Sequence, residues 1–268
     1  MILADPLSIE AIRRRLHAGI VGRHLYLFGE VESTNTVLRH LARSGAAEGT
    51  VVLADGQRQG RGRLGQAWFS PSGVNLYASA LFREGLTAAT APLFSLIAGL
   101  AVADAIRELG LHPAIKWPND VLVDTKKVAG SLVECATRGE AVDFLVLGVG
   151  VNLNVEVAAL RAALGPAAAA ATSLAAAGGC EIDRSAFAAS YLNHLDAWAT
   201  RFRTGGASSV LAAWRDRDIL TGRRVLVRGH RTSFEGRVLG LNEAGRLVVE
   251  GGFGRPHVIL TEEIRVLD

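Results

Sequence analysis

The stretch ADGQRQGRGRLGQAWFSP, residues 54–71, decides how the fold and chemistry of this chain are interpreted. Glycines, arginines and aromatics alternate in it directly after a short apolar run, which predicts a loop that leaves a buried strand. Its glycines allow the backbone to approach a ligand closely, while Arg61 and Arg63 offer planar donor forks suited to phosphate or carboxylate. The loop is therefore expected to close over an anion. Taken alone, it also fits a mobile basic loop without a ligand.

Four further motifs surround this loop, one before it and three after it. They are ESTN (residues 32–35), KWPND (116–120), KVAG (127–130) and GVGVN (148–152). Five short motifs in one order and spacing are far more specific than any one of them alone. With them the chain resembles the biotin protein ligases, also called biotin–[acetyl-CoA-carboxylase] ligases. The resemblance runs from about residue 32 to residue 154, and a weaker one covers the C-terminal tail.

Length and composition indicate a folded protein. A chain of 268 residues, 49% of them hydrophobic, can bury one substantial core and form a small second domain. Cys135 and Cys180 are too few and too far apart for a disulfide framework or a zinc site. No apolar stretch is long and uncharged enough for a membrane span, and the N-terminus lacks the pattern of a secretory signal. A cytoplasmic protein without a membrane partner is therefore expected.

The charge pattern singles out one segment of the chain. A net charge of +3 is too small to indicate a general nucleic-acid-binding surface. Only three of the 29 basic residues are lysines, and all three, Lys116, Lys126 and Lys127, fall within twelve residues. Genome composition explains the excess of arginine, but not this clustering. Lysine is kept where a compact ammonium on a flexible stem is needed, so residues 116–127 are predicted to carry chemistry.

Hydrophobic periodicity predicts the order of the elements up to residue 154. Helices are predicted at 8–18, 35–43 and 92–109, and strands at 24–28, 51–54, 74–82, 114–117, 121–124, 128–134 and 144–152. This order predicts an α+β fold in which a mixed, largely antiparallel sheet is packed with helices. The resemblance implies that it is a class II synthetase-like catalytic domain.

The character of the chain changes after residue 154. Alanine-rich helices with a Gly-Pro break are predicted at 156–179, and amphipathic helices at 184–202 and 208–217. Short alternating strands follow at 224–228, 234–241, 246–250 and 257–260, with a hairpin turn at 242–245. They predict a small β-barrel, similar to the SH3-like C-terminal domain of the ligases. We expect a catalytic domain over residues 1–220 and this second domain over residues 221–268.

The segment before the ESTN motif bears on a further property of the family. Some members carry an N-terminal winged helix-turn-helix that represses transcription, whereas only about thirty residues precede the motif here. The resemblance therefore implies the ligase-only type, with no DNA partner.

The resemblance implies an ATP-dependent reaction in two steps. Biotin is joined to AMP with release of pyrophosphate, and biotinyl-5′-AMP then passes its biotinyl group to one lysine of a biotin carboxyl carrier protein or domain. Mg²⁺ is expected with ATP. The sequence shows no carboxylate cluster that would form a metal site, so phosphates and water would supply most of its ligands. The acceptor carboxylase is left open, and so is a homodimer.

The same resemblance assigns roles to individual residues. It implies biotin contacts from Ser33, Thr34, Asn35, Gln57, Arg61, Gly62, Arg63 and Lys127, and ATP contacts from Arg61, Arg63, Trp68, Asn75, Lys127 and Asn152. Arg63 and Lys127 are expected to be catalytic, because they would stabilise charge between the biotin carboxylate and the α-phosphate. Asp120 is the third catalytic residue, which would take up a proton from, or orient, the carrier lysine.

Simpler interpretations exist for several of these residues. Ser33 or Thr34 could be a plain helix cap, Trp68 could belong to the core, and Lys127 could lie on the surface. Lys116 and Asn119 could act structurally or on phosphates, and the sequence does not separate the two. Gln66 departs from the family pattern, in which many members have a basic residue, so one contact to phosphate or one that orders the loop is expected to be missing.

Two rival functions fit parts of the sequence. A lipoate or octanoate ligase or transferase shares the architecture but needs an apolar tunnel, so residues 33–35 together with Gln57 favour biotin. A nucleic-acid-binding protein could use the arginines and aromatics of residues 61–69 as a stacking and phosphate surface. That function has no use for the lysine-containing segment 116–127.

Overall fold

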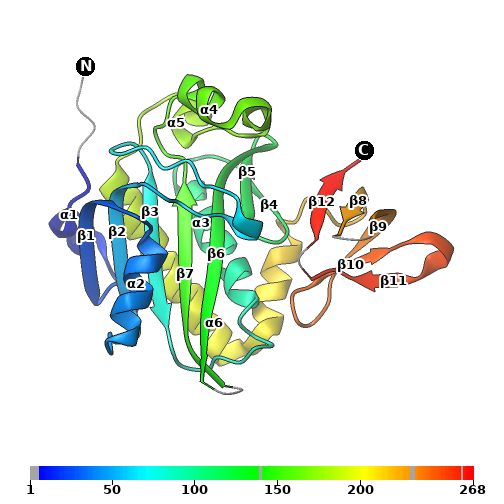
Figure 1. Ribbon diagram of the computed structural model, residues 1–268, viewed down its shortest axis with the longest axis horizontal. Helices are drawn as coiled ribbons and strands as arrows, with labels where there is room; N and C mark the ends of the chain where they lie inside the picture. The colour runs from blue at the N-terminus through cyan, green and yellow to red at the C-terminus, as the bar shows by residue number, and fades with distance from the viewer. Residues whose placement is uncertain (1–5, 139–140, 230–232, 261) are drawn as a thin grey trace.

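The main body of the protein is built on a seven-stranded sheet (Figure 1). The structure is a computed structural model that describes residues 6–138, 141–229, 233–260 and 262–268. The strands are β1 (His24–Val31), β2 (Thr50–Gln57), β3 (Leu76–Phe82), β4 (Pro113–Lys116), β5 (Asp120–Val123), β6 (Lys126–Arg138) and β7 (Ala141–Val151). Their spatial order is β1-β2-β3-β7-β6-β5-β4, with β1 and β2 parallel and the other neighbouring pairs antiparallel. The predicted mixed, largely antiparallel sheet is confirmed.

The back of the sheet carries the largest part of the core. Helix α3 (Leu93–Glu108) packs between the strands and α6 (Arg184–Arg215), and Figure 1 shows both helices behind the sheet. Twelve residues of α3 are buried, because its sequence is apolar on nearly all sides. A short helix, α1 (Ile9–Arg15), is capped by the Ser8 hydroxyl and packs on α6. The strands are therefore fixed from behind.

Helix α2 (Thr34–Arg43) covers the front of strands β2, β3 and β7. Its Leu38 and Ala42 belong to a second apolar cluster that includes Val52 and Phe144 of the sheet. This packing fixes the N-terminus of the helix, which begins within the ESTN motif. Ser33 is at the N-cap position, but its side chain forms no capping hydrogen bond. The helix-cap interpretation thus explains the position of Ser33 and gives no role to its hydroxyl.

The segment between β7 and α6 is largely helical. It contains α4 (Val157–Leu164), the 3₁₀ helix η2 (Gly165–Ala170) and α5 (Leu174–Gly178), which Figure 1 shows at the top of the molecule. The two helices predicted at 184–202 and 208–217 are found as the two parts of α6. It is interrupted at Gly206, whose φ of +67° lies outside the helical region. No helix in the described part of the chain is both long enough and apolar enough to cross a membrane.

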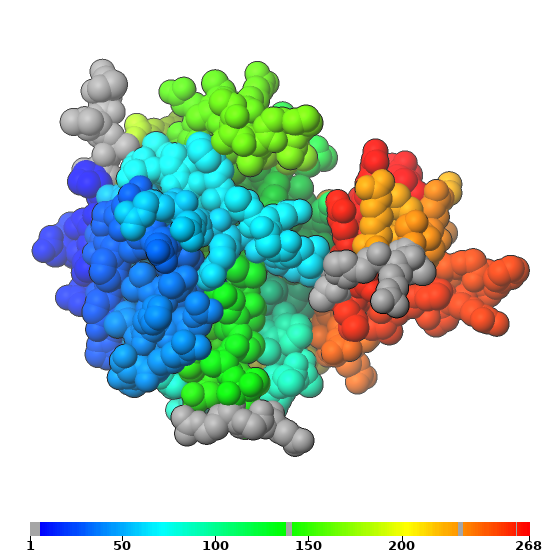
Figure 2. Space-filling view, viewed as in Figure 1, coloured from blue at the N-terminus to red at the C-terminus, as the bar shows by residue number. Residues whose placement is uncertain are grey.

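The C-terminal residues form a separate five-stranded sheet, the orange and red lobe of Figure 2. Its strands are β8 (Arg224–Arg228), β9 (Ser233–Leu241), β10 (Leu247–Glu250), β11 (Pro256–Val258) and β12 (Glu263–Val266), in the order β11-β10-β9-β8-β12. They form the small SH3-like domain that the sequence predicts. The sequence did not predict β12, which pairs with β8 from the far end of the domain.

The two sheets are connected more closely than by a simple linker. The proposed division at residue 220 lies between α6 and β8, where the amide of Ile219 donates to the carbonyl of Ile115 in β4. The turn before β10 also contacts the main body. Trp117 Nε1 donates to the Gly245 carbonyl at 3.0 Å, and a Cβ added to Gly245 would lie 2.6 Å from Leu93 of α3. The C-terminal domain is thus seated directly on the KWPND motif.

Candidate active site

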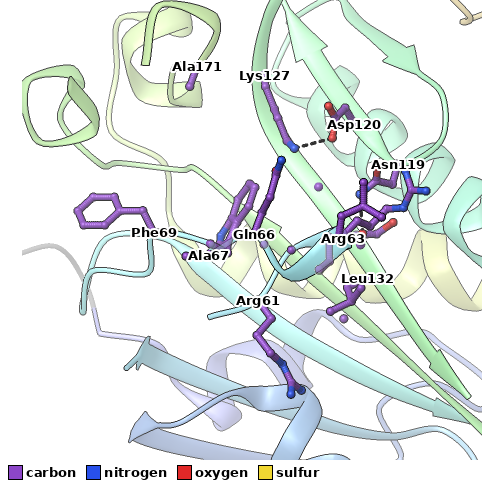
Figure 3. A pocket seen from close by; sticks show the side chains of 18 of the residues that line it. Arg61, Arg63, Gln66, Ala67, Phe69, Asn119, Asp120, Lys127, Leu132 and Ala171 are labelled. Carbon is purple, nitrogen blue, oxygen red and sulfur yellow. Dashed lines mark hydrogen bonds and ion pairs between the residues drawn. The ribbon is translucent and has the colours of Figure 1, made fainter. Parts of the chain in front are cut away.

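All five motifs line one pocket of about 440 Å³ at the front of the sheet (Figure 3). Strands β6 and β7, the start of α2, the loop after β2 and the β4–β5 hairpin contribute to its walls. Eleven of the twelve predicted site residues line it: Ser33, Thr34, Asn35, Gln57, Arg61, Gly62, Arg63, Trp68, Asp120, Lys127 and Asn152. Segments more than a hundred residues apart in the sequence therefore meet at one place.

Asn75 is the predicted ATP contact that the structure does not bring into the pocket. Its side chain is fully buried; Oδ1 accepts from the Leu153 amide at 3.0 Å, and Nδ2 donates to the Tyr77 hydroxyl at 3.1 Å. Tyr77 in turn donates to the Pro71 carbonyl at 2.9 Å. Asn75 thus ties the end of the glycine-arginine loop to the segment after β7. Asn75 lies outside the pocket lining, and its contact to the nucleotide stays a prediction.

Gln57 and the ESTN motif form a hydrogen-bonded polar end of the pocket. Gln57 Oε1 accepts from the Thr34 amide at 2.9 Å and from the Thr34 hydroxyl at 3.2 Å, while Gln57 Nε2 donates to the Ser70 hydroxyl at 3.0 Å. Ser79 Oγ, on β3, lies 2.8 Å from Thr34 Oγ1 and 2.6 Å from Asn35 Oδ1. Such a network fixes side-chain orientations, as a small ligand rich in donors and acceptors requires.

Two glycines of the GVGVN motif make room for side chains of other motifs. A Cβ added to Gly148 would lie 2.2 Å from Asn35 Oδ1, and one added to Gly150 would lie 2.3 Å from Trp68 Nε1. Any larger residue would displace these side chains. β7 therefore supports both ends of the pocket, with Asn35 resting on one glycine and Trp68 on the other.

The glycine-arginine loop folds back on itself over the pocket. The Gly62 amide donates to the Gln66 carbonyl at 2.7 Å, and a short 3₁₀ turn, η1 (Arg63–Gly65), forms its tip. Arg61 is directed away from Lys127 and Asp120 (Figure 3). Its guanidinium donates to Glu134 at 3.1 Å and to the Thr36 hydroxyl at 3.2 Å. In this arrangement Arg61 is held by protein groups beside the pocket.

Arg63 is half-buried at the side of the pocket formed by the KWPND motif. Its guanidinium lies 6.0 Å from the centre of the Trp117 ring, within the range of a cation–π contact. Burial lowers the pKa of Arg63 from its ordinary value, while the negative charge of Asp120 acts in the opposite direction. A guanidinium stays protonated under both influences. Arg63 is therefore a fixed positive charge that lines the pocket.

Lys127 and Asp120 form an ion pair, with 2.5 Å between Lys127 Nζ and Asp120 Oδ1 (Figure 3). The same ammonium lies 5.3 Å from the centre of the Trp68 ring. The pair is partly exposed, with 32% of the Lys127 side chain and 24% of the Asp120 side chain accessible. Lys126, in contrast, is exposed and does not line the pocket. The surface interpretation thus applies to Lys126 and not to Lys127.

Lys116 and Asn119, whose roles the sequence left open, have different surroundings in the structure. Asn119 is buried, and its Nδ2 donates to the Ser131 carbonyl at 2.7 Å, so it fixes the β4–β5 turn against β6. Lys116 is half-buried and lines the pocket together with Asp120. Asn119 thus makes a structural contact, and it lines the pocket as Lys116 does, so the roles of both residues stay open.

The alanine-rich segment also lines the pocket, which the sequence did not reveal. It contributes a set of apolar residues: Leu160, Leu164, Ala167, Ala170 and Ala171. Hydrogen bonds tie it to two motifs, because the Thr172 amide donates to the Lys127 carbonyl and Asn152 Nδ2 donates to the Thr172 carbonyl, each at 3.0 Å. The only signal in the sequence is the position of an apolar run just after the GVGVN motif. The C-terminal domain adds Glu262, Glu263 and Ile264 to the lining.

The fold and the pocket together define a class of protein. The pocket on the mixed sheet has a polar end that suits a small ligand, an apolar and aromatic end, and positively charged side chains beside them. Enzymes that activate a carboxylic acid with a nucleotide need such an arrangement. The sequence pattern of the biotin/lipoate A/B protein ligase family matches residues 27–152, which include all five motifs. The chain belongs to the biotin protein ligase family.

Individual relatives match over most of their length. A biotin–[acetyl-CoA-carboxylase] ligase of Mycobacterium tuberculosis is 34% identical over 98% of this chain and 96% of its own. The bifunctional ligase/repressor BirA of Bacillus subtilis is 31% identical over 92% of this chain and 76% of its own. Among solved structures, the biotin protein ligase from Aquifex aeolicus in complex with biotin and ATP is 28% identical. It covers 91% of this chain and 100% of its own, with a TM-score of 0.77.

Proposed function

We propose that this protein activates biotin with ATP as biotinyl-5′-AMP and transfers the biotinyl group to a lysine of a biotin carboxyl carrier protein. One observation carries the proposal. A single pocket joins the polar network of Thr34, Asn35 and Gln57 to Trp68 and Lys127. Two substrates can therefore lie end to end, with their reacting groups meeting near the cations.

The polar end suits the ureido ring of biotin. That ring offers two N–H donors and one carbonyl acceptor, and the network supplies fixed hydroxyl and amide groups around Ser33, Thr34 and Asn35. A lipoyl or octanoyl chain has no groups that could pair with such a network, and leaving buried polar groups unpaired is costly. The pocket thus favours biotin over lipoate.

The other end suits the adenosine of ATP. Trp68 offers a ring face, and the alanine-rich segment offers an apolar surface opposite the strands. Of the other residues predicted to contact ATP, Lys127 lies against the Trp68 ring, Asn152 also lines the pocket, and Arg63 lies at its KWPND side. Asn152 is fixed by its hydrogen bond to Thr172, so the apolar segment and the GVGVN motif form one surface.

In the first step a carboxylate oxygen of biotin attacks the α-phosphorus of ATP. The bond between that phosphorus and the bridging oxygen breaks, and pyrophosphate leaves with the electron pair. Arg63 and Lys127 are fixed positive charges that stabilise the negative charge that builds up on the phosphate oxygens. The residues near this site do no covalent chemistry; they position the two substrates and neutralise charge.

In the second step the ε-amine of the carrier lysine attacks the carbonyl carbon of biotinyl-AMP. The bond from that carbon to the phosphate oxygen breaks, AMP leaves, and an amide forms. The lysine must lose a proton to become a nucleophile, and we assign the uptake of this proton to the Asp120 carboxylate, which lines the pocket. The ion pair with Lys127 orients the Asp120 carboxylate.

Mg²⁺ would accompany ATP rather than occupy a site made by the protein. Among the residues that the structure describes, no three histidine, cysteine or acidic side chains are grouped to hold a metal ion. Mg²⁺ keeps several waters and binds phosphates readily, so the pocket fits a metal bound mainly by the phosphates of ATP. When bound, it would neutralise phosphate charge.

A transfer assay tests the proposed function. The protein is incubated with biotin, ATP, Mg²⁺ and a biotin carboxyl carrier domain, and the mass of the carrier is measured by mass spectrometry. We expect the mass of one biotinyl group to be added, and none to be added to a carrier whose acceptor lysine is replaced by arginine. Lipoate in place of biotin is the parallel arm. Transfer of lipoate without transfer of biotin would overturn the proposal.

A further inference from the structure

Glu134 on β6 is a carboxylate that the reaction described above does not use. Its Oε2 accepts from Asn35 Nδ2 at 2.7 Å and from Arg61 Nη2 at 3.1 Å. Arg39 of α2 faces it as well, with 3.7 Å between Arg39 Nη1 and Glu134 Oε1. The side chain is 24% exposed, so it lies in the wall of the fold rather than in open solvent.

These contacts join two motifs that are otherwise separate. Asn35 belongs to the ESTN motif at the polar end of the pocket, and Arg61 belongs to the loop that folds over it. Both side chains donate to the same carboxylate oxygen, Glu134 Oε2. The other end of the Asn35 amide, Oδ1, accepts from the Ser79 hydroxyl at 2.6 Å. One group, Glu134, therefore contacts both the Asn35 amide and the Arg61 guanidinium.

The charge of Glu134 matters as much as its shape. Two guanidinium groups and one amide N–H face the carboxylate, and a carboxylate only accepts hydrogen bonds. The side-chain amide of a glutamine at this position would keep one acceptor oxygen. Its two N–H groups would face the N–H donors of Asn35, Arg39 and Arg61. The contact with Arg61 would then weaken, and the loop would lose a principal contact on the α2 side.

We propose that Glu134 is a positioning residue that couples the polar end of the pocket to the docking of the glycine-arginine loop. Because Asn35 and Arg61 share its carboxylate, a ligand that orders Asn35 also favours the docked loop, and a docked loop orders Asn35. This inference rests on the proposed function in one respect, namely that the ligand at the polar end is biotin. The coupling through Glu134 slows the escape of biotinyl-AMP from the pocket.

The test compares Glu134→Gln, Arg61→Gln and the double variant with the wild-type protein. Amide hydrogen exchange of residues 60–67 is measured first without any ligand, and the release rate of biotinyl-AMP is measured second. We expect each single variant to raise both rates by roughly three- to tenfold, the range for a partly exposed charge-assisted contact. The double variant should be no faster than the faster single variant, since both changes break one contact.

Glu30→Gln is the matched control. Glu30 pairs with Arg58, which lies at the base of the same loop, at 3.4 Å, but both side chains are more than half exposed and neither lines the pocket. This variant should leave loop exchange and release at wild-type rates. Should Glu134→Gln fail to fold, Arg61→Gln still probes the contact from its exposed side.

The outcomes are distinct. Unchanged loop exchange in Glu134→Gln, or rate increases that multiply in the double variant, would overturn the inference. A wild-type protein that makes no biotinyl-AMP would overturn the proposed function instead. The exchange measurement without ligand would still decide the role of Glu134.

Discussion

Lys127 Nζ lies 2.5 Å from Asp120 Oδ1, so the ammonium assigned to the first step is bonded to the carboxylate assigned to the second. The two residues come from different motifs on adjacent strands, β5 and β6, where a bulge shifts the register between Val121 and Leu122. A substrate carboxylate or phosphate that reaches Lys127 must share it with Asp120. In the proposed mechanism the two half-reactions are therefore linked through one ion pair.

Replacing Lys127 with arginine tests whether the shape of this cation matters. A Cβ on Gly130 would lie 3.3 Å from Lys127 Nζ and 3.4 Å from the Trp68 ring, so there is little space around the ammonium. A guanidinium is wider and cannot occupy the same place without moving the ligand. We expect Lys127→Arg to slow biotinyl-AMP formation by roughly a hundredfold, a misplacement effect, measured as pyrophosphate release.

Lys126→Arg is the control for this change, because Lys126 is exposed on the neighbouring position. It should retain the wild-type rate. Equal rates in the two variants would show that Lys127 contributes only a positive charge.

Asp120→Asn should separate the two half-reactions. Asparagine keeps the size of the side chain but cannot accept a proton from the carrier lysine, and a general base contributes at least about a hundredfold. Transfer from preformed biotinyl-AMP should fall by that factor, while adenylate formation should change by only a few fold. Single-turnover assays of each step provide the measurement. An equal loss in both steps would assign Asp120 to the geometry of Lys127 alone.

Arg63→Ala should depress adenylate formation without unfolding the protein. The guanidinium lines the pocket and makes a cation–π contact with Trp117. Its removal therefore takes a positive charge from the site and leaves the apolar core intact. A charge-assisted contact is worth roughly 1.5–3 kcal/mol, which corresponds to about one to two decades in rate or affinity. Wild-type synthesis of biotinyl-AMP, together with an unchanged melting temperature, would contradict this role.

Two glycine variants on one strand should affect different substrates. Gly150→Ala places a methyl group against Trp68 and should raise the KM for ATP by roughly tenfold, a typical cost of overpacking. Gly148→Ala places a methyl group against Asn35 and should raise the KM for biotin to a similar degree. Each variant is the control for the other, since both lie on the same face of β7. If both variants raised the KM for the same substrate, the pocket would not be divided between biotin and ATP as proposed.

The main sheet is predictable because its elements carry strong local patterns. α3 is apolar around its circumference and β7 is a nearly continuous apolar run, so each is evident without its neighbours. β12 and the second half of β6 are strands because β8 and β7 pair with them. β12 pairs with a distant strand and the end of β6 with its neighbour, and neither kind of pairing is visible in the local periodicity of one segment.

The site is predictable where a side chain carries its own chemistry. The five motifs, through their resemblance to the biotin protein ligases, indicated eleven residues that line the pocket. An alanine side chain carries no functional group, so the sequence did not predict the apolar wall of the pocket at residues 160–171. Asn75 lies outside the pocket lining because the fold brings its partners, Leu153 and Tyr77, to it.

The hydrogen bond from Trp117 to the Gly245 carbonyl limits how such proteins can be recombined. The turn that carries Gly245 rests on Leu93 and Leu96 of α3, while its carbonyl holds an indole of the KWPND motif. A chimera that takes its C-terminal domain from a relative must supply a turn that fits both surfaces at once. The two domains can therefore be exchanged only as a matched pair, and a graft that ignores this turn would disturb the neighbourhood of Arg63.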